Sequence, residues 1–583
     1  MEIIDYTIVI IYFILSFGIA AYYYKRAGKS SEEFFLSGRN LPWYLAGLSM
    51  VATTFAADTP LAVTELVAKN GVAGNWVWWN FAFGGLLTVF FFARLWRRSG
   101  VMTEVEFTEL RYSGKQAGFL RGFRSIYLGL FMNVIIIGWV NSAMIAILQG
   151  MFGIPESQVM IYVFAAMLFV AIYSAISGLW GVVVTDAVQF IIAMGGTIVL
   201  AVVVVTSPEI GGLSGLKEKL PASTFEFFPR IVSVGAGDVA GVMSITLVAF
   251  LAFIGIQWWA SWYPGQEPGG GGYVAQRMMS AKDEKHSLYA TLFFQIAHYA
   301  LRPWPWILVG LSTLVLYPDL ADKKLGYIYA MNDFLPAGLK GLLVAAFFAA
   351  YMSTIATQLN WGTSYLINDF YKRFVKPLST EKEMVAASRI VTLLLMVVGA
   401  IATMYITRIS GAWEFILEAG AGLGLVLILR WYWWRINAWS EISAMVAPFI
   451  FLPLVRYFSI EFPFSLYYLV SATTIVWIVV TFATKPESEE TLIRFYRKVY
   501  PGGRFWKPIS DKVGKIQGAS EAKFGLMFIG WFAGVVLVYS VLFGIGSLLF
   551  DTWQMAAMYF AASAASTTAI IVVFSKYGWK NLN

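Results

Sequence analysis

Polar and ionisable side chains interrupt several long apolar stretches of this chain, and their types are those that bind an alkali cation or a small solute. One such place ends in Asp58, Thr59 and Pro60. A proline at this position removes the backbone hydrogen bond to the carbonyl of Ala56, and freed carbonyls are hard oxygen ligands of the kind that alkali cations prefer. The alternative is a proline kink in which Asp58 is satisfied by a structural partner.

Small and hydroxyl-bearing residues form a stripe in the apolar stretch 339–368. Ala350, Ser353, Thr354 and Thr357 are three or four residues apart, so a helix presents them on one side. Such a stripe either lines a functional surface or allows two membrane helices to pack closely. The spacing alone leaves both interpretations open.

Two single charged residues in other stretches need a partner, because an ionisable side chain is expensive inside a bilayer. Asp186 lies near the start of the stretch 182–206, where it can snorkel or cap the helix N-terminus. Arg302 follows His298 by one helical turn and precedes two Pro-Trp pairs. A guanidinium at this depth needs an anion, which is either a carboxylate of the protein or a substrate.

A glycine-rich segment follows the tryptophans that end the stretch 241–263. It contains two prolines and five glycines between residues 264 and 272. This segment cannot stay helical. It is either a cytoplasmic loop or non-helical backbone that lines a cavity, where such backbone is tolerated at membrane depth.

Composition excludes most soluble and enzymatic alternatives. Of the 583 residues, 59% are hydrophobic and only 13% are charged, whereas a soluble domain carries about 25% charged residues. Cysteine is absent and histidine occurs twice, so neither disulfides nor a thiolate or imidazole metal centre is expected. No nucleophile–base set is visible, which argues against an enzyme. The net charge of +8 follows membrane topology rather than a nucleic-acid partner.

Apolar stretches recur along the chain at the length that a helix needs to cross a bilayer. We expect an all-α integral membrane protein with about fifteen transmembrane helices, because a membrane barrel would show short segments of alternating polarity. An N-terminus outside the cell and a cytoplasmic C-terminus assign most Lys and Arg residues to the cytoplasm. The expected spans are 4–24, 41–68, 74–96, 125–152, 158–178, 182–206, 241–263, 288–317, 339–368, 386–408, 413–430, 440–458, 464–484, 524–549 and 552–575.

Several short motifs follow one another along the chain. They are Glu33 to Pro42, Thr103 to Phe107 with Arg111 and Tyr112, Gly178 to Gln189, and Tyr351 to Gln358 with Asn368 to Tyr371. In this combination they resemble the sodium:solute symporter family, which contains bacterial proline, sialic acid and galactose symporters and animal glucose cotransporters. The likeness covers about residues 1–480.

The resemblance implies a core of five helices repeated with inverted topology, in which sites lie at the midplane between broken helices. It divides the chain into an additional N-terminal helix and cytoplasmic loop (1–40), a first repeat (41–207), a second repeat with a periplasmic loop (208–440) and additional C-terminal helices (441–583). The last part contains a basic cytoplasmic segment, 485–523, which reads as a surface helix and a turn with too few aliphatic residues for a core of its own.

By resemblance, the main sodium site of the family falls on the carbonyls of Ala52, Phe55 and Ala350 and the hydroxyls of Ser353 and Thr354. These neutral oxygens suit an ion that binds weakly and leaves again.

Asp186 and Thr357 match positions that some family members use for a second ion or for coupling. Ala356 replaces one of the hydroxyls that such a second site needs. We therefore expect sodium as the only metal ion, with Asp186 supporting coupling rather than holding a second ion.

The substrate region implied by the resemblance is more aromatic here than in better-known members. Stacked aromatic rings with a few polar groups suit a sugar, whereas Arg302 with Asp58 or Glu267 suits a zwitterion or a carboxylate. The expected substrate contacts are Asp58, Thr59, Trp78, Phe81, Trp258, Trp259, Trp262, His298 and Arg302.

These features predict a sodium-coupled secondary transporter that imports a small polar organic solute, such as a sugar, an amino acid or a carboxylate, by alternating access. An uncoupled uniporter or channel is the first alternative, and Ser353 and Thr354 argue against it. A transporter-like sensor is the second, and the chain after Lys485 returns to two more spans rather than to a signalling domain. The expected location is a bacterial-type inner membrane. The expected partners are the solute, sodium and the lipid bilayer, with no nucleic acid and no obligate protein partner.

Overall fold

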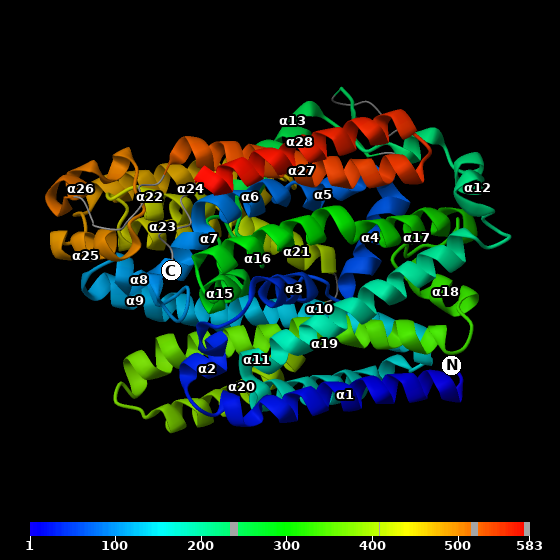
Figure 1. Cartoon of the computed structure of the whole chain (residues 1–583), viewed down its shortest axis with the longest axis horizontal. Helices are drawn as coiled ribbons and strands as arrows, with labels where there is room; N and C mark the ends of the chain where they lie inside the picture. Colours follow the sequence, from blue (N-terminus) through cyan, green and yellow to red (C-terminus); the bar gives the residue numbers. More distant parts are fainter. Residues whose placement is uncertain (234–242, 407–408, 515–522, 577–583) are drawn as a thin grey trace.

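The protein is a bundle of long helices that lie side by side along one direction (Figure 1). The structure is a computed structural model, and it describes residues 1–233, 243–406, 409–514 and 523–576. Helix α1 (Ile3–Ala27) packs against α11 (Glu156–Val205) and α19 (Leu339–Ser364) at one side of the bundle. Helices α27 (Phe524–Leu549) and α28 (Trp553–Lys576) pack against each other at the opposite side. The outer faces of α1 and α28 expose large aliphatic and aromatic side chains, as a lipid-facing surface requires.

Ten helical segments of the described residues are long and apolar enough to cross a membrane, or eleven if one bent pair counts as a span. The bent pair joins Trp413–Ala419, within α21 (Ile409–Ala419), to α22 (Leu423–Tyr432) at an angle of 51°. The ten segments are α1, Val72–Ser99, Gly114–Phe152, α11, Leu339–Val375, α20 (Glu381–Thr403), α23 (Ala438–Tyr457), α24 (Phe464–Ala483), α27 and α28.

This number is smaller than the fifteen spans expected from the sequence, and α11 shows one reason. Its 50 residues correspond to about 75 Å of helix, more than twice the ~30 Å of a hydrocarbon core. Gly178 interrupts it with φ 56° and ψ −163°, a conformation that only glycine adopts readily. The interruption separates the stretches 158–178 and 182–206, which the sequence counts as two spans.

Broken helices are the second reason, because none of their parts is long enough by itself. The expected span 41–68 consists of α3 (Trp43–Thr53) and α4 (Asp58–Asn70). The expected span 241–263 contains α13 (Leu247–Ala252), η6 (Phe253–Gln257) and α14 (Trp258–Ala260), and the span 288–317 contains α16 (Glu284–Ile296), η7 (Ala297–Leu301) and α17 (Pro303–Leu316).

Three of the long segments are themselves composites of shorter elements. Val72–Ser99 contains η2 (Val72–Asn75), α5 (Trp76–Trp79), α6 (Phe81–Leu87), η3 (Thr88–Phe92) and α7 (Ala93–Ser99). Gly114–Phe152 contains α9 (Gly114–Ile126), η4 (Tyr127–Met132) and α10 (Asn133–Phe152), and Leu339–Val375 contains α19 and η8 (Tyr365–Val375).

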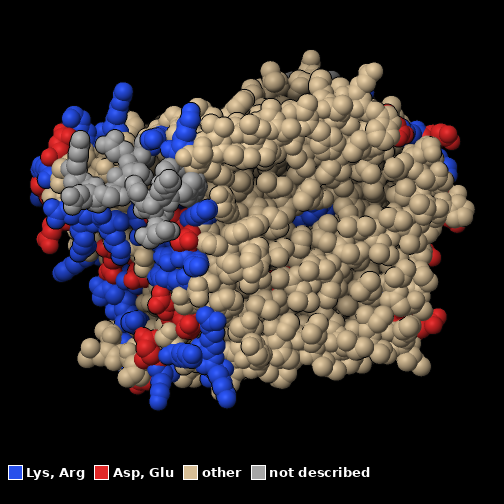
Figure 2. Space-filling view, in the orientation of Figure 1, with Lys and Arg blue, Asp and Glu red and all other residues tan. Residues whose placement is uncertain are grey.

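Charge is concentrated at the two ends of the bundle. Figure 2 shows that Lys and Arg gather at one end, where Figure 1 places α2 (Ser31–Leu36), α8 (Phe107–Arg111), α25 (Glu489–Val499) and α26 (Lys507–Val513). Helix α25 is the surface helix expected within 485–523. The opposite end carries α12 (Gly212–Lys219), α18 (Leu325–Phe334) and the start of α1. Strands β1 (Arg230–Ile231) and β2 (Ser244–Ile245) pair in parallel.

A buried cluster of two arginines and two glutamates ties the basic end together. Arg124 contacts Glu104 and also donates to Glu441 at 2.7 Å. Arg430 donates to Glu441 at 3.3 Å and lies 3.7 Å from Glu104. The two positive and two negative charges balance, so the cluster needs no further ion.

Candidate functional site

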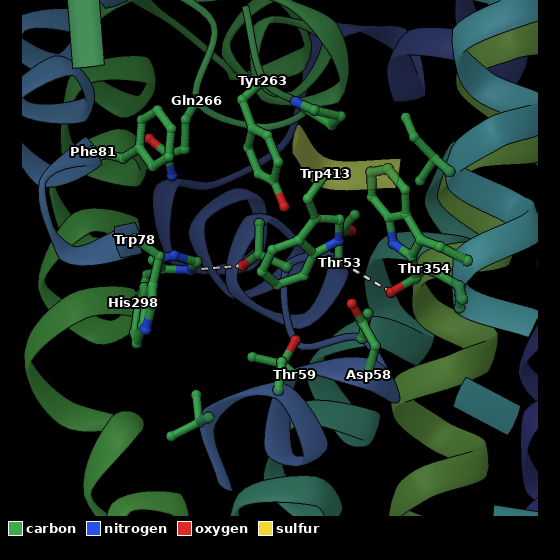
Figure 3. A pocket seen from close by; sticks show the side chains of 18 of the residues that line it. Thr53, Asp58, Thr59, Trp78, Phe81, Tyr263, Gln266, His298, Thr354 and Trp413 are labelled. Atoms are coloured by element: carbon green, nitrogen blue, oxygen red, sulfur yellow. Dashed lines mark hydrogen bonds between the residues drawn. The ribbon is translucent and has the colours of Figure 1, made fainter. Parts of the chain in front are cut away.

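A cavity of about 120 Å³ lies where the break between α3 and α4 faces α5, η7, α19 and α21. Pro60 falls in the first turn of α4, a position that tolerates proline, so the break expected near Asp58 is confirmed. Aromatic side chains form much of the wall, as Figure 3 shows for Trp78, Phe81, Tyr263 and Trp413. The cavity therefore combines apolar surface with a short stretch of unwound backbone.

Two opposite charges line this cavity without touching each other. Asp58 is 3% exposed, and its Oδ1 has no hydrogen-bond partner among the described residues. Arg302 donates from Nη1 to the Val51 carbonyl and the Thr54 hydroxyl, both at 3.2 Å. Its Nε has no hydrogen-bond partner among the residues that the structure describes. Neither Asp58 nor Glu267 forms a direct ion pair with Arg302 in the described structure. Asp58 is nevertheless near enough to Arg302 for the two opposite charges to attract each other.

His298 connects the helix that carries Arg302 to the break in the other helix. One of its ring nitrogens lies 2.9 Å from the Thr54 hydroxyl, and its ring packs edge-on against Trp78. Trp78 in turn donates its indole N–H to Asn75 at 2.9 Å. These contacts fix one wall of the cavity in place.

The oxygens expected to hold sodium lie beside the same break. The Thr354 hydroxyl donates to the Thr53 carbonyl at 2.9 Å, and it also lies 3.2 Å from the Ala350 carbonyl of its own helix. Helix α3 ends at Thr53, and the Ala52 carbonyl beside this end accepts the Phe55 N–H at 3.0 Å. Helix α19 and the end of α3 therefore bring backbone and hydroxyl oxygens together.

Asp186 is at the centre of a buried polar network next to these oxygens. It accepts hydrogen bonds from Ser49 at 2.5 Å and from Ser353 at 2.7 Å. Arg277 approaches it to 3.8 Å and donates to Ser49 at 3.1 Å. Asp186 is 0% exposed, which excludes snorkelling, and it lies inside α11 beyond the Gly178 interruption rather than at a helix N-terminus, which excludes capping.

Arg277 also bonds to Thr357, the hydroxyl that was expected to assist Asp186. Its Nη2 donates to Thr357 Oγ1 at 2.8 Å, and Thr357 lies 3.0 Å from the Thr53 hydroxyl. A guanidinium of the protein therefore contacts Thr357 and approaches Asp186, the two residues expected to serve a second ion or coupling.

The sequence of the chain matches one transporter family over most of its length. The model of the sodium:solute symporter family matches residues 34–447, which is more than half of the chain. The chain belongs to this family. It is therefore a multi-pass membrane protein and a sodium-coupled solute symporter, not an enzyme.

Curated relatives of the symporter match most of its length at low identity. A sodium/glucose cotransporter of Vibrio parahaemolyticus is 25% identical over 76% of this chain and 82% of its own. A sodium/mannose cotransporter of Bos taurus is 23% identical over 74% of this chain and 72% of its own. Among solved structures, a Na⁺-coupled sialic acid symporter in a substrate-bound outward-open state has the same fold, with a TM-score of 0.66 at 20% identity, covering 84% of this chain and 99% of that one.

Most of the substrate contacts expected from the sequence line the cavity of the symporter. These are Asp58, Thr59, Trp78, Phe81, His298 and Arg302. Trp258, Trp259 and Trp262 are not among the lining residues. Trp258 packs against Phe83 and Trp531, and Trp262 bonds through its backbone to Gly420. Helix α14 ends at Ala260, so helical spacing could not show which way these rings point.

Other residues of the site were not predicted from the sequence. Tyr263, Gln266 and Trp413 line the cavity, and Arg277 reaches Asp186. A signal existed for Arg277 alone, because it is a charged residue in the otherwise uncharged stretch between Glu267 and Lys282. The sequence did not show that this stretch is buried rather than cytoplasmic.

Proposed function

We propose that the symporter imports a small polar organic solute through this cavity by alternating access and that sodium bound beside the cavity drives the import. The proposed sodium ligands are the carbonyls of Ala52, Phe55 and Ala350 and the hydroxyls of Ser353 and Thr354. The family assignment supports the use of sodium. The position of Thr354 supports the coupling, because this one residue both contacts the break in α3 and lines the cavity.

The physical link between ion and solute is the unwound backbone between Thr53 and Asp58. An ion that binds the carbonyls of this stretch orders it, and the same stretch presents Thr54, Asp58 and Thr59 to the solute. A ligand binds more tightly to a site that another ligand has already ordered. Sodium on one side of the break therefore raises the affinity for solute on the other.

The charges of the cavity favour a zwitterionic solute over a neutral sugar. An unpaired carboxylate, Asp58, suits an ammonium group, and an unpaired guanidinium, Arg302, suits a carboxylate through a forked pair of hydrogen bonds. The aromatic wall adds apolar surface between them. A neutral sugar would leave both charges buried without a counter-ion in direct contact, which is costly.

The finer architecture that we propose is a five-plus-five inverted repeat within about fifteen spans. The interruption in α11 and the broken helices support the higher span count, because each expected span then has the length of a membrane crossing. The gathering of Lys and Arg at the end opposite the start of α1 supports an external N-terminus and a cytoplasmic C-terminus.

Uptake into proteoliposomes tests this proposal. Purified symporter is reconstituted and offered labelled zwitterionic amino acids, sugars and carboxylates, with an inward sodium gradient or with choline in place of sodium. We expect an amino acid to accumulate above its external concentration only with the sodium gradient. Equal accumulation in choline would contradict sodium coupling, and accumulation of neutral sugars alone would contradict the assignment of Asp58 and Arg302 to the solute.

A further inference from the structure

The glycine-rich segment 264–272 is buried backbone rather than an exposed loop. Every one of its residues is buried, and its position is fixed by contacts with distant elements. Trp96 of α7 donates its indole N–H to the Gly269 carbonyl at 2.9 Å, and the Gly272 N–H donates to Glu104 at 2.7 Å. Helix α15 (Gly272–Ser280) begins at the end of the segment.

Glycine is required in this segment by both conformation and space. Gly269, Gly270 and Gly272 have positive φ values of 80°, 74° and 56°, which residues with a Cβ rarely adopt. A Cβ on Gly272 would lie 2.2 Å from Oε1 of Glu267. The glycines therefore allow the backbone to wrap closely around the Glu267 side chain.

A second, small cavity lies beside this carboxylate. Its volume of about 10 Å³ is close to the minimum that holds one water-sized particle. Glu267, Gln266 and Gln295 are the polar side chains with unpartnered oxygens in its wall. Glycine backbone and Thr88 complete the lining.

The oxygens that face this cavity lack hydrogen-bond donors. Both carboxylate oxygens of Glu267 are without a partner among the described residues, as are Oε1 of Gln266 and Oε1 of Gln295; the Gln266 amide nitrogen also has no partner there. The backbone N–H groups of Gly265 and Glu267 lie near the carboxylate without hydrogen-bond geometry. The three side chains are 3%, 8% and 1% exposed, so bulk water does not satisfy them either.

The negative charge of Glu267 also has no cation of the protein to balance it. The neighbouring Glu104 is paired with Arg124, and that arginine belongs to the balanced cluster described above. No described Lys, Arg or His forms an ion pair with Glu267. A buried carboxylate in this condition is unfavourable unless it binds a cation or a proton.

We propose that this cavity is a binding site for one alkali cation, sodium under the conditions of transport, held by the carboxylate of Glu267 and the side-chain oxygens of Gln266 and Gln295. One formal charge with neutral amide oxygens suits a monovalent hard cation. A divalent ion is disfavoured, because the described residues contain no group of three acidic or histidine side chains that could hold one.

The site is adjacent to the solute cavity, because Gln266 lines both cavities. Figure 3 shows Gln266 beside Phe81 in the wall of the larger one. A cation at Glu267 fixes the Gln266 side chain and thereby one part of the cavity wall that contacts the solute. The site lies apart from the sodium ligands of α3 and α19, so it is a second ion site in addition to the proposed one.

Equilibrium binding of radioactive sodium to the purified full-length symporter tests this site. Ionic strength is held constant with choline, and the number of bound ions is measured for the wild type, Glu267→Gln and Ser353→Ala/Thr354→Ala. We expect two ions per wild-type chain and one for each variant. Glu284→Gln is the matched control, because this glutamate is paired with Arg94 and Arg98, and the count should stay at two.

Three other results would overturn the proposed cation site. A count that is unchanged in Glu267→Gln overturns the site and leaves the proposed function intact, because the other variant still tests the first ion. If Glu267→Gln does not fold, Gln295→Leu replaces it. This variant removes one neutral ligand and should weaken one sodium affinity by roughly tenfold; an unchanged affinity overturns the site. An infrared band of a protonated Glu267 that persists in saturating sodium also overturns it.

Discussion

Asp186 and Glu267 are both buried carboxylates close to the solute cavity, yet their surroundings differ completely. Asp186 accepts hydrogen bonds from Ser49 and Ser353, and Arg277 lies 3.8 Å away. Glu267 has no hydrogen-bond or ion-pair partner among the described residues. Both charges are removed from water, so both must be compensated. The protein supplies the cation for Asp186 from its own chain, whereas Glu267 is left open to one from solution.

This difference assigns different roles to two carboxylates that look alike in sequence. A tethered guanidinium cannot leave, so Asp186 is a fixed part of the scaffold beside the proposed sodium ligands. A free cation can bind and leave, so Glu267 can take part in the transport cycle. Helix α15 connects the two regions, because it starts beside Glu267 and carries Arg277.

The largest expected effect comes from removing the tethered cation. Arg277→Met leaves Asp186 buried without its counter-charge, and breaking one side of such a pair costs about 3–5 kcal/mol. We expect a strong loss in the free energy of unfolding in detergent micelles. Arg277→Met/Asp186→Asn should recover much of it, because no charge is then left unpaired. A single variant as stable as the wild type would show that Arg277 does not compensate Asp186.

The complementary change at Glu267 should reduce the stabilisation of the protein by sodium and leave the stability of the sodium-free protein unchanged. A hundredfold excess of sodium over its Kd stabilises a binding protein by about 2.7 kcal/mol per site. For Glu267→Gln, the gain in unfolding free energy from choline to sodium buffer should be smaller than in the wild type by the contribution of one site. Its unfolding free energy in choline should not fall. A thermal melt in both buffers measures this. An equal sodium effect in wild type and variant would remove the contrast with Asp186.

Smaller effects are expected at the first sodium site. Ser353→Ala and Thr354→Ala each remove one proposed ligand, and we expect each to raise the sodium concentration for half-maximal uptake by roughly tenfold. Ser364→Ala is the matched control, because within the described part of the chain its hydroxyl bonds only to the Trp361 carbonyl of the same helix. If both ligand variants keep the wild-type sodium dependence, the site lies elsewhere.

Substitutions of Arg302 and Asp58, which line the solute cavity, should change the affinity for the solute and not the affinity for sodium. Arg302→Lys keeps the charge but loses the forked geometry that fits a carboxylate, and we expect a loss of roughly tenfold in solute affinity. Asp58→Asn should weaken the binding of the same solute through its ammonium group. Unchanged affinity in Arg302→Lys, with normal amounts of folded protein, would make Arg302 a structural residue.

The smallest effect separates two tryptophans that the sequence could not distinguish. Trp78→Phe removes an indole from the cavity wall together with its bond to Asn75. Trp258→Phe alters a ring that packs against Phe83 and Trp531. We expect a severalfold change in solute affinity for the first variant only. Equal effects in both would mean that the cavity wall extends to Trp258.

The sequence by itself determined the features that depend on neighbours along the chain. Apolar stretches of membrane-crossing length are a local property, and so is the helix break beside Asp58, because Pro60 lacks the N–H that a continuous helix needs. The hydroxyl stripe of α19 also follows from helical spacing alone. These local rules were enough to predict a helical membrane protein, and the family motifs added the transporter function; the residues of the proposed sodium site stay a prediction.

Only the tertiary structure decided which buried charges have partners. Arg277 meets Asp186 across 91 positions of sequence, and the spacing of neither residue indicates that contact. The glycine-rich segment contains residues typical of an exposed loop, but packing against Trp96 and Glu104 buries it. Charge compensation depends on distances between segments that are remote in sequence, and for this reason a list of residues could not distinguish a neutralised Asp186 from an uncompensated Glu267.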